Sequence, residues 1–218
     1  MLQEYIQFLS ELNKNNSKEW FDLNRARYKK LNEEFKFFVG EIILDLGKFD
    51  INVKYLQPSD CTFRINRDVR FSKNKVPYKV HVSAGFHQGG KGAYTPGYYF
   101  EIDYLGNIMI GGGQYFIEPK DMFVFRTKID QKSDRLREII ADPNFIKMYK
   151  ELGGEKLKTH PKGFSSDNPN IDLLKHKSFV GFTNFNIKNK TEVQIKKQIL
   201  TSFQALNPLV QYCREIMI

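Results

Sequence analysis

Hydrophobic residues in the first fifty positions recur every three or four residues, the spacing of one face of a helix. They form three runs: Leu2, Tyr5, Ile6, Leu9 and Leu12; Trp20, Phe21, Leu23, Tyr28 and Leu31; and Phe35, Phe38, Val39, Ile42, Ile43 and Leu46. Asn16 and Glu19 resemble a capping pair at the start of the second run. Gly47 follows the third run, where a helix commonly ends. We therefore expect the first fifty residues to be helical.

The pattern changes after Pro58 to an alternation of apolar and polar residues. Between Phe63 and Phe71 one face would carry Phe63, Ile65, Val69 and Phe71, with Arg67 among them, and the other face Arg64, Asn66, Asp68 and Arg70. A period of two is typical of a strand. We predict a strand over residues 63–71, followed by a polar loop that ends at Pro77.

Further alternating segments follow at residues 80–86, 98–103 and 107–111, and a later one at 179–187. The second and third of these are separated by a short Gly-containing turn, which predicts a hairpin. Because the connections are too short for crossover helices, the strands are expected to be antiparallel.

Helical patterns return near Pro119, at Asp142-Pro143 and from Thr191 to the end, where Pro208 is expected to kink or break the last helix. No composition shift marks a linker. The chain is therefore predicted to be a single α+β domain over residues 1–218, with N-terminal helices, a central, mostly antiparallel sheet of about four or five strands and C-terminal helices.

Composition is that of an ordinary globular protein, with 41% hydrophobic and 27% charged residues. The net charge of +9 favours anionic partners, although many lysines are scattered singly, as a lysine-rich composition alone would produce. Cys61 and Cys213 lack the spacing of a zinc site. Neither a signal peptide nor an apolar stretch of roughly 20 residues is evident. We expect a cytoplasmic protein with no membrane partner.

Candidate chemistry concentrates in one basic segment. Six cations surround a single acid, Asp68: Arg64, Arg67, Arg70, Lys73, Lys75 and Lys79. Guanidinium and ammonium groups bind phosphate and carboxylate through charge-assisted hydrogen bonds. We predict that these six residues bind an anion and that Arg64, Arg70, Lys73 and Lys75 line one cleft. In the structural alternative, Asp68 fixes a guanidinium and Arg67 pairs with a helix acid.

Supporting roles are assigned to Asp68, to Lys162 in a later loop, and to Gly111, Gly112 and Gly113, which would allow a ligand to approach the backbone. The glycines fit turns, bulges or tight packing equally well, and the nucleotide-binding glycine motifs are absent. Glu101 and Asp103 share one strand face and could hold Mg²⁺ or act as acid and base, although a solvated strand face explains them better. His81 and His87 could act as a base, but neither has a partner in a known catalytic motif. No catalytic residue, cofactor or metal can be named from the sequence.

Four segments together resemble a bacterial and fungal conserved hypothetical family, a domain of unknown function. These are Asn15-Asn-Ser-Lys-Glu-Trp-Phe-Asp-Leu-Asn-Arg25, Arg64-Ile-Asn-Arg-Asp-Val-Arg-Phe-Ser-Lys-Asn-Lys-Val-Pro-Tyr-Lys79, Gly111-Gly-Gly113, and Pro161-Lys-Gly-Phe164 with Lys177-Ser-Phe179. Asn66 stands where the family usually has an aromatic residue, and Asn74 where it has an acid. The resemblance implies one domain and brings no activity or cofactor with it.

Three functions fit these observations. The first is binding of a phosphorylated or other anionic small molecule, with an unknown reaction if the protein is an enzyme. The second is non-specific binding of single-stranded nucleic acid, which the aromatic residues interleaved with cations would support: Phe63, Phe71, Tyr78, Tyr98 and Tyr99. The third is a structural or interaction role in which the charges form an internal ion-pair network.

Overall fold

A computed structural model describes residues 1–217. The chain begins with α1 (Leu2–Lys14), α2 (Lys18–Leu23), α3 (Arg25–Leu46), the 3₁₀ turn η1 (Ile51–Val53) and α4 (Pro58–Cys61). The strands β1 (His81–His87), β2 (Gly97–Asp103) and β3 (Asn107–Gln114) follow. The rest comprises α5 (Met122–Gln131), α6 (Ser133–Ala141), α7 (Pro143–Tyr149), α8 (Ile171–Leu174), β4 (Phe179–Asn186) and α9 (Glu192–Met217). The predicted α+β class is confirmed.

The sheet is fully antiparallel and its strands lie in the order β1-β2-β3-β4. The predicted hairpin between β2 and β3 is present. Its turn is held by the Asp103 carboxylate, which accepts hydrogen bonds from the backbone N–H groups of Leu105 (2.8 Å) and Asn107 (2.9 Å). Gly106 has a φ of 78°, a conformation that favours glycine. The predicted strand at residues 179–187 is also present as β4 and completes the edge of the sheet.

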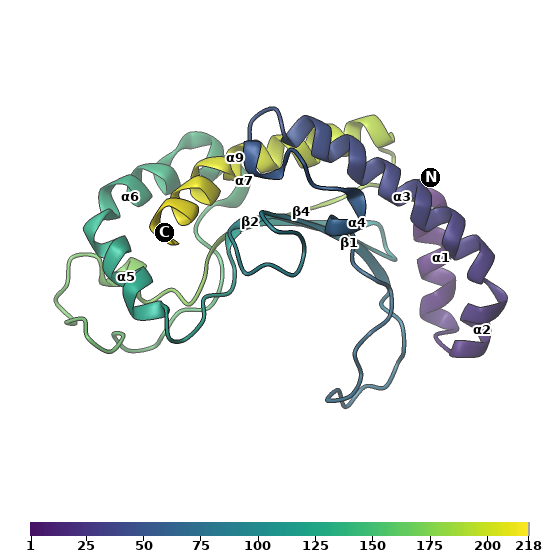
Figure 1. Ribbon diagram of the computed structural model, residues 1–218, viewed down its shortest axis with the longest axis horizontal. Coiled ribbons are helices and arrows are strands. Elements are labelled where there is room, and N and C mark those ends of the chain that lie inside the picture. Colours follow the sequence, from purple (N-terminus) through teal and green to yellow (C-terminus); the bar gives the residue numbers. More distant parts are fainter. Residues whose placement is uncertain (218) are drawn as a thin grey trace.

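The two faces of the sheet differ. Figure 1 shows α3 and α9 lying across one face, while the other face looks into the hollow of an arch. Aromatic rings fill the covered face: Phe86 contacts Phe203 of α9 (5.6 Å between centroids), and Phe100 contacts Phe35 of α3 (6.0 Å). The hydrophobic core therefore lies between the sheet and these helices, and within residues 1–217 the other face of the sheet has no helix packed across it.

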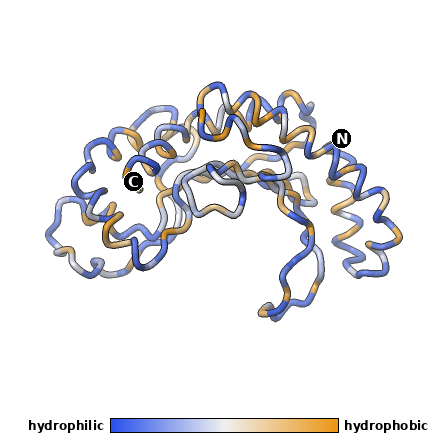
Figure 2. Tube along the Cα trace, viewed as in Figure 1, coloured by the Kyte–Doolittle hydropathy of each residue, from blue (hydrophilic) through white to orange (hydrophobic). Residues whose placement is uncertain are grey.

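The predicted strand over residues 63–71 is wrong. In this segment the structure has only isolated bridges, Thr62 to Ala84 and Asn66 to Tyr78, and residues 64–79 project from the sheet as a long loop (Figure 1), called here the basic loop. An alternating pattern forms a strand only when another strand pairs with it and one of its faces is buried. Here the chain turns back on itself before Pro77, and Phe71 is 96% exposed. Figure 2 shows a mostly hydrophilic loop with hydrophobic residues near its tip.

Two smaller predictions also need correction. Ser17, not Asn16, caps α2, because its hydroxyl accepts from the Trp20 N–H (3.2 Å). The Asn16 side chain instead forms two hydrogen bonds with the backbone of Tyr78 (3.0 and 3.1 Å), which ties the turn between α1 and α2 to the base of the basic loop. Helix α9 continues through Pro208, since Leu206 and Leu209 on either side are fully buried and their packing outweighs the lost hydrogen bond.

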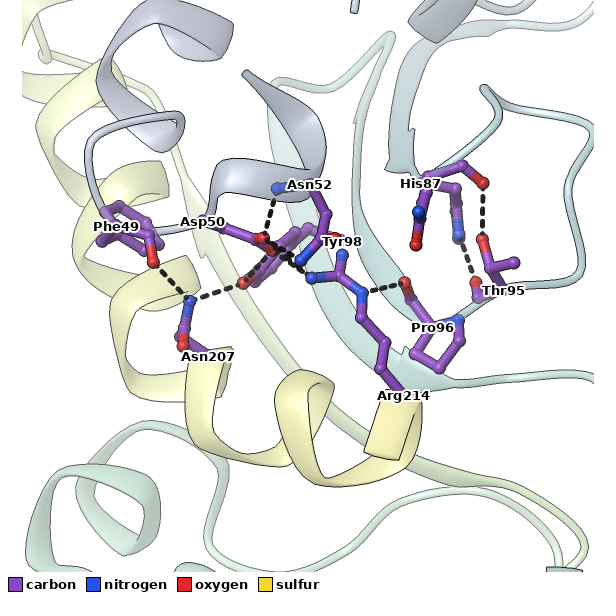
Figure 3. Close-up of polar contacts among 10 residues, drawn as sticks. Phe49, Asp50, Asn52, His87, Thr95, Pro96, Tyr98, Asn207 and Arg214 are labelled. Carbon is purple, nitrogen blue, oxygen red and sulfur yellow. Dashed lines mark hydrogen bonds and ion pairs between the residues drawn. The ribbon is translucent and has the colours of Figure 1, made fainter. Parts of the chain in front are cut away.

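A buried polar network joins the end of α3 to β2 and α9 (Figure 3). Arg214 forms an ion pair with Asp50, and its Nε donates to the carbonyl oxygen of Pro96 (3.3 Å). The Tyr98 hydroxyl donates to Asp50 (3.0 Å) and accepts from Asn207 (2.9 Å). The network therefore fixes the chain just before β2, at the rim of the uncovered sheet face.

None of the helices in residues 1–217 is both long enough and apolar enough to span a membrane.

Candidate functional site

The cations of the basic loop are mostly exposed and lack carboxylate partners. Within residues 1–217, the pair of Asp68 with Arg70 is the one ion pair that these six cations make (2.7 Å), and the Arg70 side chain is 77% exposed. The hydrogen bonds from Arg70, assisted by the charge of Arg64, hold the pKa of Asp68 below its usual range. The predicted contact between Asp68 and a cation is confirmed, and an ionised carboxylate of this kind is a poor base.

Two of the cations hold the loop together. Arg67 donates from Nη1 to the carbonyl oxygen of Val76 (3.0 Å) and from Nη2 to the hydroxyl of Ser72 (3.4 Å). Lys75 donates to the carbonyl oxygen of Val69 (2.9 Å). These bonds cross from one arm of the loop to the other, so the two side chains stabilise its shape. The partner expected for Arg67, a helix acid, is replaced by neutral oxygens.

A pocket of about 760 Å³ lies on the uncovered face of the sheet and is called here the sheet-face pocket. Gly111, Gly112 and Gly113 line it, together with Phe63 and Phe182. Arg64, Arg67, Arg70, Lys73 and Lys75 line neither this pocket nor the second one described below. Lys79 is not part of either lining, so in the described part of the chain the glycines are separated from all six predicted cations.

The glycines that line this pocket also allow a neighbouring aromatic ring to pack closely against the backbone. A Cβ on Gly111 would lie 2.6 Å from the ring of Phe182, and a Cβ on Gly153 would lie 2.8 Å from the same ring. The Phe182 ring therefore lies between two positions that need to lack a side chain. Because the ring covers the sheet where no side chain projects, it gives the pocket a broad apolar surface.

His87 presents a proton acceptor to the sheet-face pocket. Its Nδ1 lies 2.7 Å from the carbonyl oxygen of Thr95, so Nδ1 carries the hydrogen and Nε2 has the free lone pair (Figure 3). Burial, with a smaller contribution from the charge of Arg214, lowers the pKa of His87, and the ring is neutral at neutral pH. The ring lies over Gly85, since a Cβ there would be 3.2 Å from Nε2.

A second polar group lies beside Phe63. The Tyr99 hydroxyl donates to the Glu101 carboxylate (2.6 Å), and the His81 Nε2 lies 3.9 Å from the same oxygen. The Lys79 ammonium lies 5.6 Å from the centroid of the Phe63 ring. Burial and the charge of Arg64 lower the pKa of Lys79, and Glu101 opposes them. Of the six predicted cations, Lys79 therefore lies beside Phe63 of the sheet-face pocket without belonging to its lining.

Lys162 lies elsewhere. It lines a second pocket of about 1030 Å³, called here the α5 pocket, with Phe123 and Arg126 of α5. Tyr115 and Phe116 belong to the linings of both pockets. The residues singled out in the sequence thus occupy three places: the basic loop, the sheet-face pocket and the α5 pocket.

No cluster of three or more His, Cys, Asp and Glu side chains suited to a metal ion is found in the described residues, 1–217. Cys61 and Cys213 are buried free thiols. Burial raises the pKa of each thiol to about 12, so neither forms the thiolate that a nucleophile requires.

Comparison with known families gives one match. The model of the conserved hypothetical protein family DUF2461 matches residues 4–212. The chain belongs to this family. No curated protein and no solved structure matches the chain.

Sequence reasoning missed Phe182 and Arg126 as pocket residues, and it named His87 only as one of two possible bases. A signal existed for Phe182, because a glycine precedes it in an apolar run that pairs with the strand of Gly111 to Gly113. The orientation of His87 depends on the carbonyl oxygen of Thr95, and that of Arg126 on α8, contacts that no spacing in the sequence indicates.

Proposed function

We propose that this protein binds a small molecule with a flat aromatic body and an anionic group, a phosphate or another acid, in the sheet-face pocket. The observation that carries the proposal is the apolar surface made by Phe182, whose ring lies between Gly111 and Gly153. Phe63 lies on the same face and contacts Tyr99 at 6.0 Å between centroids. Surfaces of this kind favour flat rings, which stack on them at little entropic cost.

The charges around the pocket support an anion. Lys91 belongs to the lining, and Lys79 stands beside Phe63. Glu101 is the one carboxylate in the lining formed by the described residues, and the Tyr99 hydroxyl already donates to it. Neither ammonium group forms an ion pair within residues 1–217, and Lys91 donates to the neutral carbonyl oxygen of Ser59. A ligand acid would therefore meet little competition from protein carboxylates.

His87 gives the pocket a hydrogen-bond acceptor. Its free Nε2 is oriented by Thr95, whose segment is in turn held by the bond from Arg214 to Pro96. A hydroxyl or amine on the ligand would find a fixed acceptor there. The same atom would act as a base if the bound molecule reacts.

The test uses two probes that differ only in charge, 1-naphthyl phosphate and 1-naphthol, with binding measured by calorimetry. Phe182→Ala is expected to weaken both probes, because it removes the apolar surface. Lys79→Gln is expected to weaken the phosphate probe by about threefold to tenfold and to leave naphthol unchanged. Lys120→Gln is the control, since Lys120 is exposed and pairs with Glu118. Equal effects of Lys79→Gln and Lys120→Gln would refute the proposal.

Single-stranded nucleic acid remains a second candidate, because Phe71 is 96% exposed at the loop tip and Arg70 lies 5.8 Å from its ring centroid. Of the other aromatics considered, Tyr78 and Tyr98 are buried and unable to stack on a base. Under this alternative, Phe71→Ala would weaken binding of an oligothymidylate at least fivefold, by about 1 kcal/mol. An unchanged affinity would exclude base stacking at the tip.

A further inference from the structure

Arg126 is a buried charge without a counter-ion. Its residue exposure is 9%, and within residues 1–217 no carboxylate lies within ion-pair distance of it. Its Nε donates to the carbonyl oxygen of Leu174 (2.7 Å) and its Nη2 to that of His176 (3.2 Å). Leu174 is the last residue of α8, where a helix end leaves carbonyl groups free, and His176 lies two residues beyond it. The acceptors are neutral, and the positive charge stays uncompensated.

Burial is the sole cause that lowers the pKa of Arg126. In the other strongly buried arginine, Arg214, the guanidinium is paired with Asp50. A buried guanidinium normally has such a partner, because the loss of hydration otherwise goes unbalanced. The comparison identifies Arg126 as a site where an external anion would supply the missing partner.

The remaining donors of Arg126 face a cavity. A guanidinium has five N–H donors, of which the two carbonyl bonds use two. Nη1 has no hydrogen-bond partner in the described residues, yet it is not sealed from solvent. Arg126 belongs to the lining of the α5 pocket, so its accessible edge opens into that space.

Glycines bring the pocket walls close together. Gly163 has a φ of 89°, and a Cβ on it would lie 2.5 Å from the ring of Phe123. Gly154 has the same φ of 89°, and a side chain on it would collide with Ser178. The loop that carries Lys162 therefore packs directly against α5, and its Gly154 packs against the segment of Lys177 and Ser178 just before β4.

The other charged side chains that line the α5 pocket leave it with a net positive charge. Lys177 is paired with Glu155 at 2.7 Å, and both side chains are exposed at the mouth. Lys162 is exposed and has no hydrogen-bond or ion-pair partner within residues 1–217. The remaining wall is largely apolar and includes Phe116, Ile117 and Met122.

We propose that the α5 pocket is a second binding site, which takes an organic acid by its carboxylate and holds its apolar body against the aromatic wall. The carboxylate binds the free edge of Arg126, and Lys162 strengthens binding from the mouth. A carboxylate fits better than a phosphate because one guanidinium balances one negative charge, and its planar shape matches the fork.

This site goes beyond the function proposed for the sheet-face pocket. The two pockets have Tyr115 and Phe116 in common, but the anion sites lie on different elements: α5 here, and the base of the basic loop there. Either site can be present without the other. Their tests use different residues, so the failure of one leaves the other standing.

The experiment maps benzoate on the unmodified protein by backbone amide NMR shifts, with benzyl alcohol and inorganic phosphate as comparison probes. Benzoate is expected to shift residues 154–163 and 177–178 with a dissociation constant of about 1 mM or lower. Benzyl alcohol is expected to bind at least about tenfold more weakly, because it lacks the charge. Equal shifts by benzoate and benzyl alcohol, or phosphate binding more tightly than benzoate, would overturn the proposal.

Substitutions test which positive charges contribute to benzoate binding. Lys162→Glu is expected to weaken benzoate about threefold to fivefold, whereas the control Lys158→Glu, in the same loop but outside the lining, leaves the affinity within about twofold. Arg126→Met is expected to abolish benzoate binding while the fold is monitored by thermal unfolding. If Arg126→Met does not fold, the shift map and the pair of lysine variants still decide the matter. Equal effects of the two lysine variants would contradict a specific site.

Discussion

Arg214 Nη1 lies 2.8 and 2.7 Å from the two carboxylate oxygens of Asp50, although 164 positions separate the residues in the chain (Figure 3). Asp50 is 1% exposed and Arg214 is 9% exposed. The pair joins the last turns of α9 to the segment after α3. Through the bond from Arg214 to Pro96, it also fixes the chain that carries Thr95 and thereby orients His87.

Arg214→Met is expected to destabilise the protein by about 3–5 kcal/mol, because it leaves the buried Asp50 carboxylate without its cation. Urea unfolding measures the loss. The matched control is Arg135→Met, which removes an exposed ion pair between Arg135 of α6 and Glu215 of α9, the helix that also carries Arg214, and is expected to cost less than about 1 kcal/mol. Similar losses for the two variants would show that the Asp50 pair is not the dominant buried interaction.

The pair of Asp50 and Arg214 also predicts that the stability of the protein depends on pH. Burial alone would raise the pKa of Asp50, but the hydrogen bonds and charge of Arg214 outweigh burial and hold the pKa below its usual range. An acid whose folded pKa is depressed stabilises the protein above its unfolded pKa of about 3.9, and this stabilisation is lost as the pH falls through the folded value. The stability difference between the wild type and Asp50→Asn is therefore expected to shrink below about pH 4. A constant difference between about pH 3 and 7 would contradict the assignment.

Asp68→Asn makes the same chemical change at an exposed ion pair. It is expected to leave the free energy of unfolding unchanged within error, because water replaces the lost contact to Arg70. If the pair were buried, as the sequence allows, the loss would be large. Parallel urea curves for Asp68→Asn and Asp50→Asn provide the comparison, and a measurable loss at Asp68 would mean that the loop is packed in solution.

Gly111→Ala tests the packing of the sheet-face pocket. The added Cβ meets the Phe182 ring at 2.6 Å, so a loss of about 1–2 kcal/mol is expected. In a Phe182→Ala background most of that loss should disappear, since the colliding ring is gone. Gly92→Ala, where nothing lies within 4 Å of the added atom, is the control. If the effects at positions 111 and 182 are simply additive, the ring does not lie on Gly111.

Limited digestion with trypsin tests the prediction of one domain. The enzyme is expected to cut first within residues 64–79, where lysines and arginines are exposed. The pieces should stay associated, because the core runs from Leu9 of α1 through Phe100 of β2 to Phe203 of α9. A folded N-terminal fragment that ends near residue 58 and separates from the rest would contradict a single domain.

The sequence was sufficient to predict those helices and strands that bury one apolar face. The helices before Gly47, the hairpin at Gly106 and the strand from Phe179 were predicted because their apolar periodicity matches burial in the structure. The segment from Phe63 to Phe71 has an equally regular pattern and forms no strand, since no neighbour covers Phe71. Periodicity indicates which residues would share a face, and only tertiary packing decides whether that face is buried.

The candidate site was less predictable. The dense cluster of cations indicated Arg64 to Lys75, but five of these cations lie outside both pockets, because a long loop carries them away from the sheet. Lys79 is also absent from both linings, but it lies beside Phe63 of the sheet-face pocket, where the loop meets the sheet. Arg126 gave no signal in the sequence. Its unpaired charge depends on α8 being brought against α5, a contact that no motif marks.

The most direct test of the central claim is an amide NMR shift map of the protein titrated with 1-naphthyl phosphate. Binding in the sheet-face pocket predicts saturable shifts concentrated at residues 97–101 and 109–114, with further shifts at Lys79 and Lys91. Shifts confined to residues 64–75, or spread over exposed lysines without saturation, would contradict it.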